Sequence, residues 1–199
     1  LALPILGQRF NAVIGRDSTE TFIDDSYDDA AFLPGSFSDD TYAKWYAGLN
    51  YLAASDDRSV FDLGGGIKLE SPLNPYVRAR YRHFLAPRPA LLMTLRSTAF
   101  WENDDGFGVT LGADSDWSID DARLLRWANT ATLSQGTEGV RWRSRLSLYD
   151  ALDARSAMRY QASVQGQTDG VQPDYYGLRA TYRRSAWRDW FFLEFSGSL

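Results

Sequence analysis

The sequence predicts an all-β fold, an antiparallel transmembrane β-barrel of about twelve strands, and three observations support this fold class. Apolar and polar residues alternate through most of the chain. The apolar side of nearly every segment carries no charge, and Trp and Tyr recur near segment ends. Because successive side chains of a strand point to opposite faces, each segment has one apolar and one polar face. This pattern is typical of strands that separate lipid from a polar lumen.

Eleven strand candidates are bounded by clusters of Gly, Pro, Asp, Asn or Ser. Their lengths suit tilted membrane strands, which need about 9 to 11 residues. Prolines at 72, 75, 87, 89 and 173 are predicted to lie in connections, where a missing N–H breaks no ladder. The candidates are 4–16, 41–54, 59–70, 76–86, 90–102, 106–118, 122–134, 138–150, 156–168, 174–185 and 188–199.

A soluble β-sandwich or lipocalin-like barrel is the alternative, because its strands also alternate. The segment 106–118 shows the pattern most clearly, with Val109 and Leu111 opposite Thr110 and Asp114. In a soluble protein the apolar face would point inward, whereas the charge-free apolar faces and aromatic segment ends favour the membrane barrel. Two exceptions to the alternation are Asn129, which falls on an apolar face, and a phase break near Gln8 that indicates a bulge or a wrong register.

An odd number of strands poses a closure problem, because closed bacterial barrels of a single chain have an even number. We expect a twelfth strand to come from residues beyond 199. The segment 17–40 and an unusual closure are the other possibilities. The chain is otherwise predicted to be a single barrel domain, 1–199.

The formal charge of −5 is unevenly distributed. Residues 1–62 hold 11 acids and 4 bases, whereas residues 63–199 hold 15 acids and 17 bases. Eight acids lie in the segment 17–40, whose spacing does not match a calcium-binding EF-hand loop. We interpret this segment as a solvated surface loop and predict no metal site. Divalent ions near lipopolysaccharide could relieve the repulsion within its Asp-Asp pairs.

Arginine dominates the polar faces. If the strand phases are taken literally, eleven arginines and Lys68 point into the lumen, where guanidinium groups stay charged and bind carboxylate or phosphate. These lumen and anion-binding candidates are Arg78, Arg80, Arg82, Arg96, Arg126, Arg141, Arg143, Arg145, Arg159, Arg179 and Arg183. The acids predicted to face them are Asp62, Glu70, Glu102, Asp114, Asp116 and Glu194. The alternative interpretation is a lumen filled by salt-bridged side chains, which would conduct nothing.

Catalytic constellations are weaker. The only histidine, His83, falls on an apolar face near a strand end, where a girdle histidine is expected rather than the base of a Ser-His hydrolase. Asp114, Asp116 and Glu102 are interpreted as salt-bridge partners rather than as a protease site. The glycines 64–66 lie inside a strand, where they would allow a bend or close packing of an aromatic ring, and do not form a phosphate loop.

Five stretches resemble an uncharacterised family of proteobacterial outer-membrane β-barrel proteins. The stretches are Gly106-Phe107-Gly108, Leu124-Leu125-Arg126-Trp127, Ser147-Leu148-Tyr149, Tyr176-Gly177-Leu178-Arg179 and Trp190-Phe191-Phe192-Leu193-Glu194. The resemblance spans roughly residues 59–199 and implies a Gram-negative envelope protein, but no catalytic motif.

The sequence therefore predicts a porin-like protein of the bacterial outer membrane that forms a narrow channel for small anionic solutes. The alternative is a non-conducting structural barrel that forms part of a larger cell-envelope complex. We expect no enzyme activity, no cofactor and no nucleic-acid partner. The expected partners are outer-membrane lipid and lipopolysaccharide, with protein partners in the envelope as a further possibility.

Overall fold

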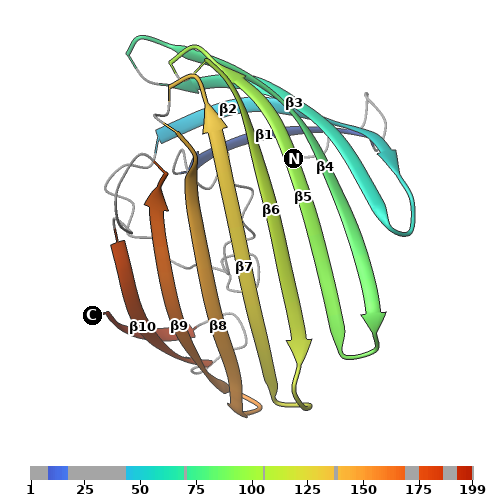
Figure 1. Ribbon diagram of the computed structural model, residues 1–199. Coiled ribbons are helices and arrows are strands. Elements are labelled where there is room, and N and C mark those ends of the chain that lie inside the picture. The colour runs from blue at the N-terminus through green and yellow to red at the C-terminus, as the bar shows by residue number, and fades with distance from the viewer. Residues whose placement is uncertain are drawn as a thin grey trace.

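The computed structural model describes residues 9–17, 44–69, 71–104, 106–136, 139–168, 175–185 and 192–198. Within these ranges the chain forms one antiparallel sheet of eleven strands, each paired with the next. The sheet curls along its width, so that β1 to β3 pass behind the strands in front (Figure 1). The strands are β1 Phe10–Asp17, β2 Lys44–Ser55, β3 Ser59–Leu69, β4 Asn74–Arg88, β5 Leu91–Glu102, β6 Gly106–Ser118, β7 Arg123–Ser134, β8 Arg141–Asp153, β9 Ser156–Gln167, β10 Tyr175–Ser185 and β11 Phe192–Ser198.

The predicted strands are confirmed, since each of the eleven segments overlaps one strand in the predicted order. The segment 106–118 matches β6 at both ends. Residue 8, where the phase break was predicted, lies outside the described residues, and so does most of the acidic segment 17–40. The described residues contain no helix long and apolar enough to span a membrane.

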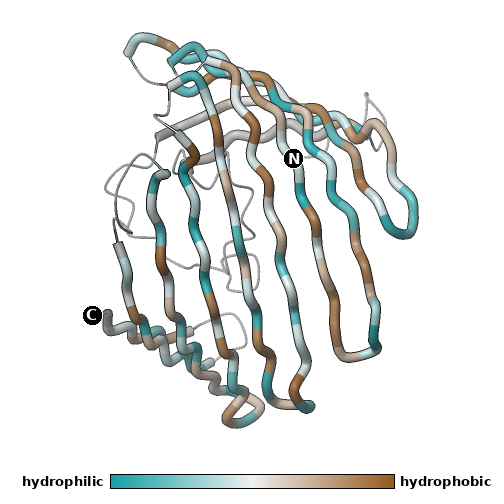
Figure 2. The backbone as a smooth tube through the Cα atoms, viewed as in Figure 1, coloured by the Kyte–Doolittle hydropathy of each residue, from teal (hydrophilic) through white to brown (hydrophobic). Residues whose placement is uncertain are grey.

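The two faces of the sheet differ in burial in the opposite sense to a soluble protein. In β3, Asp62 and Lys68 are each 5% exposed, whereas Leu63 and Ile67, from the alternate positions, are each 42% exposed. Figure 2 shows the same alternation of hydrophilic and hydrophobic residues along most strands. The polar face therefore lines the concave interior and the apolar face forms the exterior.

The same inversion holds for the described part of the chain as a whole. Twelve polar or charged residues are buried there, against two large hydrophobic residues, Tyr76 and Phe100. Large apolar side chains such as Val109, Leu111 and Leu178 stay exposed. A soluble sandwich or lipocalin-like barrel buries its apolar face, so the soluble alternative is wrong. Sequential antiparallel order with a polar interior and an apolar exterior is the architecture of an outer-membrane β-barrel.

Glycines on the interior face leave room for large side chains of the facing strands. Gly48 and Gly66 stand in one register row with Tyr76, and a Cβ on Gly66 would lie 2.8 Å from the Tyr76 hydroxyl. Gly108 stands opposite Phe100, whose ring occupies the space of a Cβ. The expectation that glycines 64–66 admit an aromatic neighbour is thereby confirmed, and these contacts supply the two buried aromatic residues.

Three register shifts interrupt the ladders, and all lie at the same end of the sheet. They fall between Leu52 and Ala54, between Leu85 and Arg88, and between Ala151 and Asp153. The prediction that all the prolines lie in connections is wrong for those at 75 and 87, which lie within β4. Pro75 is the second residue of the strand, and Pro87 lies in the register shift between Leu85 and Arg88. Ladders tolerate a missing N–H at both places.

The two ends of the sheet differ in the length of their connections. At one end the links β2–β3, β4–β5, β6–β7, β8–β9 and β10–β11 have two to six residues. At the opposite end four links have three to seven residues, and the β1–β2 link spans 18–43. Outer-membrane barrels have short periplasmic turns and longer extracellular loops, so the end without the long β1–β2 link has the feature that is typical of a periplasmic end. At the other end, the rings of Trp101 and Phe107 lie 6.5 Å apart, as expected for an aromatic girdle.

The edges β1 and β11 do not pair with each other in the described ranges. Because ten antiparallel steps separate them, these two strands run in the same direction. One further strand, antiparallel to both, would fit between them and complete the even number of closed barrels. The predicted twelfth strand and its source in the sequence stay predictions.

An arginine-lined interior as the candidate functional site

All eleven arginines predicted to line the lumen occupy interior register positions. One interior register row runs from Asp62 through Arg80, Thr98, Thr110 and Thr132 to Arg141. A second interior row runs from Asp116 through Arg126, Ser147 and Gln161 to Arg179. Arg96 is buried, Arg141 and Arg179 are exposed, and the others are half-buried. The predicted role of these residues in anion binding stays a prediction.

On β3 to β5, interior cations pair with acids of the neighbouring strand or of the next strand but one. Lys68 and Glu102 form a buried ion pair, although β4 lies between their strands. Asp62 accepts hydrogen bonds from Arg80 at 3.0 Å and from Arg82 at 3.5 Å. Because both members of the Lys68–Glu102 pair are shielded from solvent, removing one of them should cost more stability than breaking an exposed ion pair.

On β5 to β7 the pairing continues. Arg96 donates to Asp114 at 2.8 Å, and Arg126 contacts both oxygens of Asp116, at 2.5 and 2.9 Å. A two-point contact between a guanidinium and a carboxylate is both strong and directional. The expectation that Glu102, Asp114 and Asp116 are salt-bridge partners is therefore confirmed. We call the interior face of β3 to β7 the paired wall.

Glycines also determine how the arginines of the paired wall lie. Gly64 stands between Arg78 and Asn50 in one register row, and Arg78 reaches the Asn50 amide oxygen at 3.3 Å. Gly112 stands opposite Arg96, and a Cβ there would lie 2.9 Å from the Arg96 Nε. The missing side chains let both guanidinium groups lie flat against the sheet.

The interior face of β8 to β10, which we call the arginine wall, has a different composition. Its cations are Arg141, Arg143, Arg145, Arg159, Arg179 and Arg183. The interior positions between them carry hydroxyl, amide, Gly and Tyr side chains, with no Asp or Glu from 141 to 149, 159 to 167 or 175 to 185. The Arg143 Nε donates to the Gln165 side-chain oxygen at 3.0 Å, an uncharged partner.

The two walls therefore contribute unequal charge. The described interior positions of the paired wall hold six cations and four acids. The cations are Lys68, Arg78, Arg80, Arg82, Arg96 and Arg126, and the acids are Asp62, Glu102, Asp114 and Asp116. The arginine wall holds six cations, and among the described residues Glu194 of β11 is an acid that stands opposite one of them, Arg183. A cleft lined by one sign of charge concentrates ions of the opposite sign, and guanidinium groups keep their charge at physiological pH. The interior can thus attract anions along β8 to β10.

His83 lies on the exterior face near the β2–β3 turn, as predicted. Its Nδ1 lies 2.9 Å from the Ser59 hydroxyl and 3.5 Å from the Tyr81 hydroxyl. In a catalytic triad one ring nitrogen faces the serine and the other is bound to a carboxylate, whereas both hydrogen-bond contacts of His83 within the described residues use Nδ1. In the turn, backbone N–H groups of Arg58 and Ser59 lower the pKa of Asp56. This cluster fits an interfacial girdle.

Several predicted features fall outside the described residues or have no counterpart there. Glu70 and most of the acidic segment 17–40 are not described. Within the described ranges no group of three or more His, Asp or Glu residues is placed to hold a metal ion.

Sequence reasoning predicted which acids face the interior cations, but not which acid pairs with which cation. The Lys68–Glu102 pair joins strands that are not neighbours, so strand phase alone does not reveal it. A usable signal was the placement of Gly64 and Gly112 directly opposite arginines, because an interior glycine marks a side chain that crosses over it.

Comparison with known proteins finds likeness at the level of structure. No protein-family model matches the sequence, and no curated protein matches it. A KdgM porin superposes with a TM-score of 0.48 at 6% identity, covering 78% of this chain and 85% of that chain. A KdgM porin in complex with disordered oligogalacturonate superposes with a TM-score of 0.47 at 8% identity and the same coverage. No residue of this chain takes a role from these structures.

Proposed function

We propose that this protein is a channel of the bacterial outer membrane that passes small anionic solutes. The observation that carries the proposal is the arginine wall, six interior arginines on three adjacent strands with no interior acid on those strands. The exposed apolar exterior supports placement in a membrane, because such a surface is unfavourable in water. The partners then include outer-membrane phospholipid and lipopolysaccharide.

The arginine wall offers an anion several weak sites rather than one strong site. Arg141, Arg143 and Arg145 alternate along β8, so their Cα atoms are about 6.6 Å apart. Each guanidinium can form a forked contact with a carboxylate or phosphate. Neighbouring Gln161 and Gln165 add hydrogen bonds without charge. Conduction requires sites that attract an ion but release it, and a row of similar cations meets this requirement.

A non-conducting structural barrel is the second candidate, and the paired wall is the observation that favours it. Ion pairs between Arg96 and Asp114 and between Arg126 and Asp116 hold long side chains in the interior. If the arginine wall also lay against such side chains, the barrel would be filled and could serve as an anchor in an envelope complex. Measurement of ionic current separates the two candidates.

Purified protein reconstituted in planar bilayers should pass current with a reversal potential that indicates chloride preference over potassium. Fixed positive charge raises the local anion concentration, and the preference should fade toward 1 M salt, where the screening length falls to about 3 Å. Replacing Arg143, Arg145 and Arg159 by Gln should abolish or reverse the preference.

The matched control replaces three turn arginines, Arg58, Arg123 and Arg155, by Gln. These changes remove the same charge outside the interior and should leave the selectivity near that of the wild type. A wild-type protein that inserts but stays silent over a wide voltage range would contradict the channel and favour the structural barrel.

A further inference from the structure

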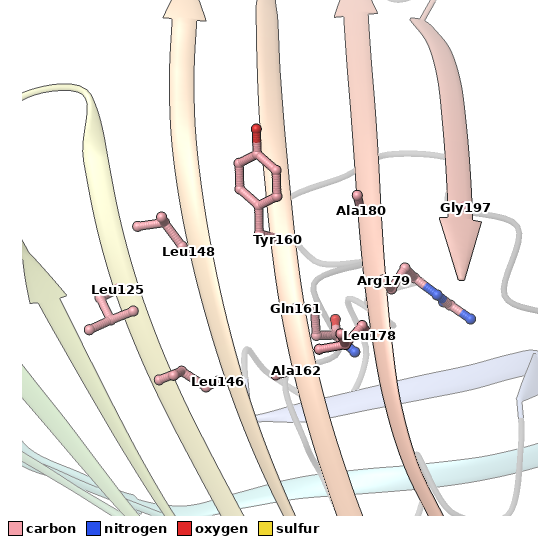
Figure 3. A pocket seen from close by; sticks show the side chains of 10 residues that line it. All are labelled: Leu125, Leu146, Leu148, Tyr160, Gln161, Ala162, Leu178, Arg179, Ala180 and Gly197. Carbon is pink, nitrogen blue, oxygen red and sulfur yellow. The ribbon is translucent and has the colours of Figure 1, made fainter. Parts of the chain in front are cut away.

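An apolar groove crosses the exterior face of β7 to β11, next to the β11 edge of the sheet (Figure 3). Its volume is about 780 Å³, within the range of roughly 300 to 1,000 Å³ that holds small-molecule ligands. The lining residues are Leu125, Leu146, Leu148, Tyr160, Gln161, Ala162, Leu178, Arg179, Ala180 and Gly197.

Strand register explains why the exterior is hollow here. One row of paired exterior residues starts with Leu125 and Leu148 and continues through Tyr160 to Ala180 and Gly197. Side-chain size therefore falls toward the sheet edge. Within the described residues, a Cβ on Gly197 would meet no atom within 4 Å, so the space beside Gly197 is open there.

The next exterior row completes the groove. Leu146, Ala162 and Leu178 are paired across β8, β9 and β10, so a small residue stands between two leucines. Ala162 and Ala180 thus form the floor, while the leucines form the sides. Gln161 and Arg179 also border the groove, although their register positions face the interior.

A molecule that fills the groove must be apolar along the whole groove and must lie in the hydrocarbon region of the membrane. An acyl chain has both properties. Five strands contribute, and with strands about 4.8 Å apart the groove crosses roughly 19 Å of sheet. A lipid tail in the groove would be contacted from its sides as well as from the floor. Each methylene group would therefore make more van der Waals contacts than on a smooth barrel wall.

A cation lies where the headgroup of such a lipid would be. Along the exterior face of β10, Tyr182 and Arg184 follow Ala180 at alternate positions, and Arg184 is about 13 Å from the groove floor. Arg184 is exposed and lies at the end with the short turns. Asp153 is close enough to interact electrostatically with Arg184, but its carboxylate already accepts the Ser156 hydroxyl and the Arg155 N–H.

We propose that this groove binds one glycerophospholipid of the periplasmic leaflet, with an acyl chain on Ala162, Ala180 and Gly197 and its phosphate at Arg184. The inference rests on the membrane placement within the proposed function, but not on conduction. The short-turn end selects phospholipid over lipopolysaccharide, because lipopolysaccharide occupies the opposite leaflet. Charge-assisted hydrogen bonds from a guanidinium suit a phosphate diester.

Native mass spectrometry of the delipidated, refolded protein with added phosphatidylglycerol tests the site. The wild type should retain one lipid per barrel. Filling the groove with Ala180→Leu and Gly197→Leu should weaken retention by at least about tenfold. Arg184→Gln should weaken it by about tenfold while the groove stays open.

The matched control is Ala99→Leu with Ala113→Leu, two exterior alanines on β5 and β6 that lie outside the groove. This control should retain lipid like the wild type. Equal retention by the groove-filled variant would overturn the site, and so would equal loss in the control. Conduction of the same proteins keeps the two proposals distinguishable. A silent wild type that retains the lipid contradicts only the channel, whereas a conducting wild type with unselective retention contradicts only the lipid site.

Discussion

Replacing Glu102 by Gln should destabilise the folded barrel by about 3 to 5 kcal/mol. Glu102 is 2% exposed and its partner Lys68 is 5% exposed, so the substitution leaves a buried ammonium without its carboxylate. Removing one member of a buried pair costs far more than removing an exposed one, because water does not replace the lost partner. The free energy of unfolding in lipid vesicles, measured by denaturant titration, gives the result.

Two further variants identify the cause of that loss. Lys68→Met combined with Glu102→Met should regain most of the stability, because an apolar pair of similar volume leaves no buried charge. Arg123→Gln breaks the exposed Asp120–Arg123 pair of the β6–β7 turn and should cost at most about 1 kcal/mol. A loss for Glu102→Gln no larger than for Arg123→Gln would show that the interior at this end is filled with water.

Leu111→Arg should cost about 2 to 4 kcal/mol in the same titration. Leu111 is near the middle of β6 on the exterior face and is 56% exposed. In water, an exposed leucine would accept the substitution almost without cost. In a bilayer the guanidinium would lie in hydrocarbon, so the size of the penalty reports the surroundings of this face.

The control places the same side chain on the other face. Thr94 points to the interior, half-buried and opposite Asp114, so an arginine there meets a carboxylate. Thr94→Arg should cost less than half as much as Leu111→Arg. A larger penalty at Thr94 than at Leu111 would mean that the faces are assigned the wrong way round.

The strands and their two faces could be predicted because strand phase is a local property. Alternation at Val109, Thr110 and Leu111 places each side chain on a face without knowledge of the rest of the chain. The same phase places all eleven arginines on one side of the sheet. Proline positions were predicted less well, because a strand can accept proline at its end, as at Pro75, or at a register shift, as at Pro87.

The contacts inside the barrel could not be predicted, because they depend on curvature and register over several strands. Lys68 reaches Glu102 across β4, and Asp62 accepts hydrogen bonds from both Arg80 and Arg82. The exterior groove is a similar case, since no single strand contains it. It arises where Ala180 and Gly197 continue a row of larger residues.

The central claim, that polar positions line an accessible interior and apolar positions meet lipid, is tested most directly by single cysteines along β9. The chain contains no cysteine, so each introduced thiol reports alone. In vesicles, Gln161→Cys and Ser163→Cys should react with a charged, membrane-impermeant thiol reagent. Fluorophores on Ala162→Cys and Val164→Cys should instead be quenched by brominated lipid. Quenching at 161 and 163 with reagent access at 162 and 164 would contradict the assignment of both faces, and with it the arginine-lined interior.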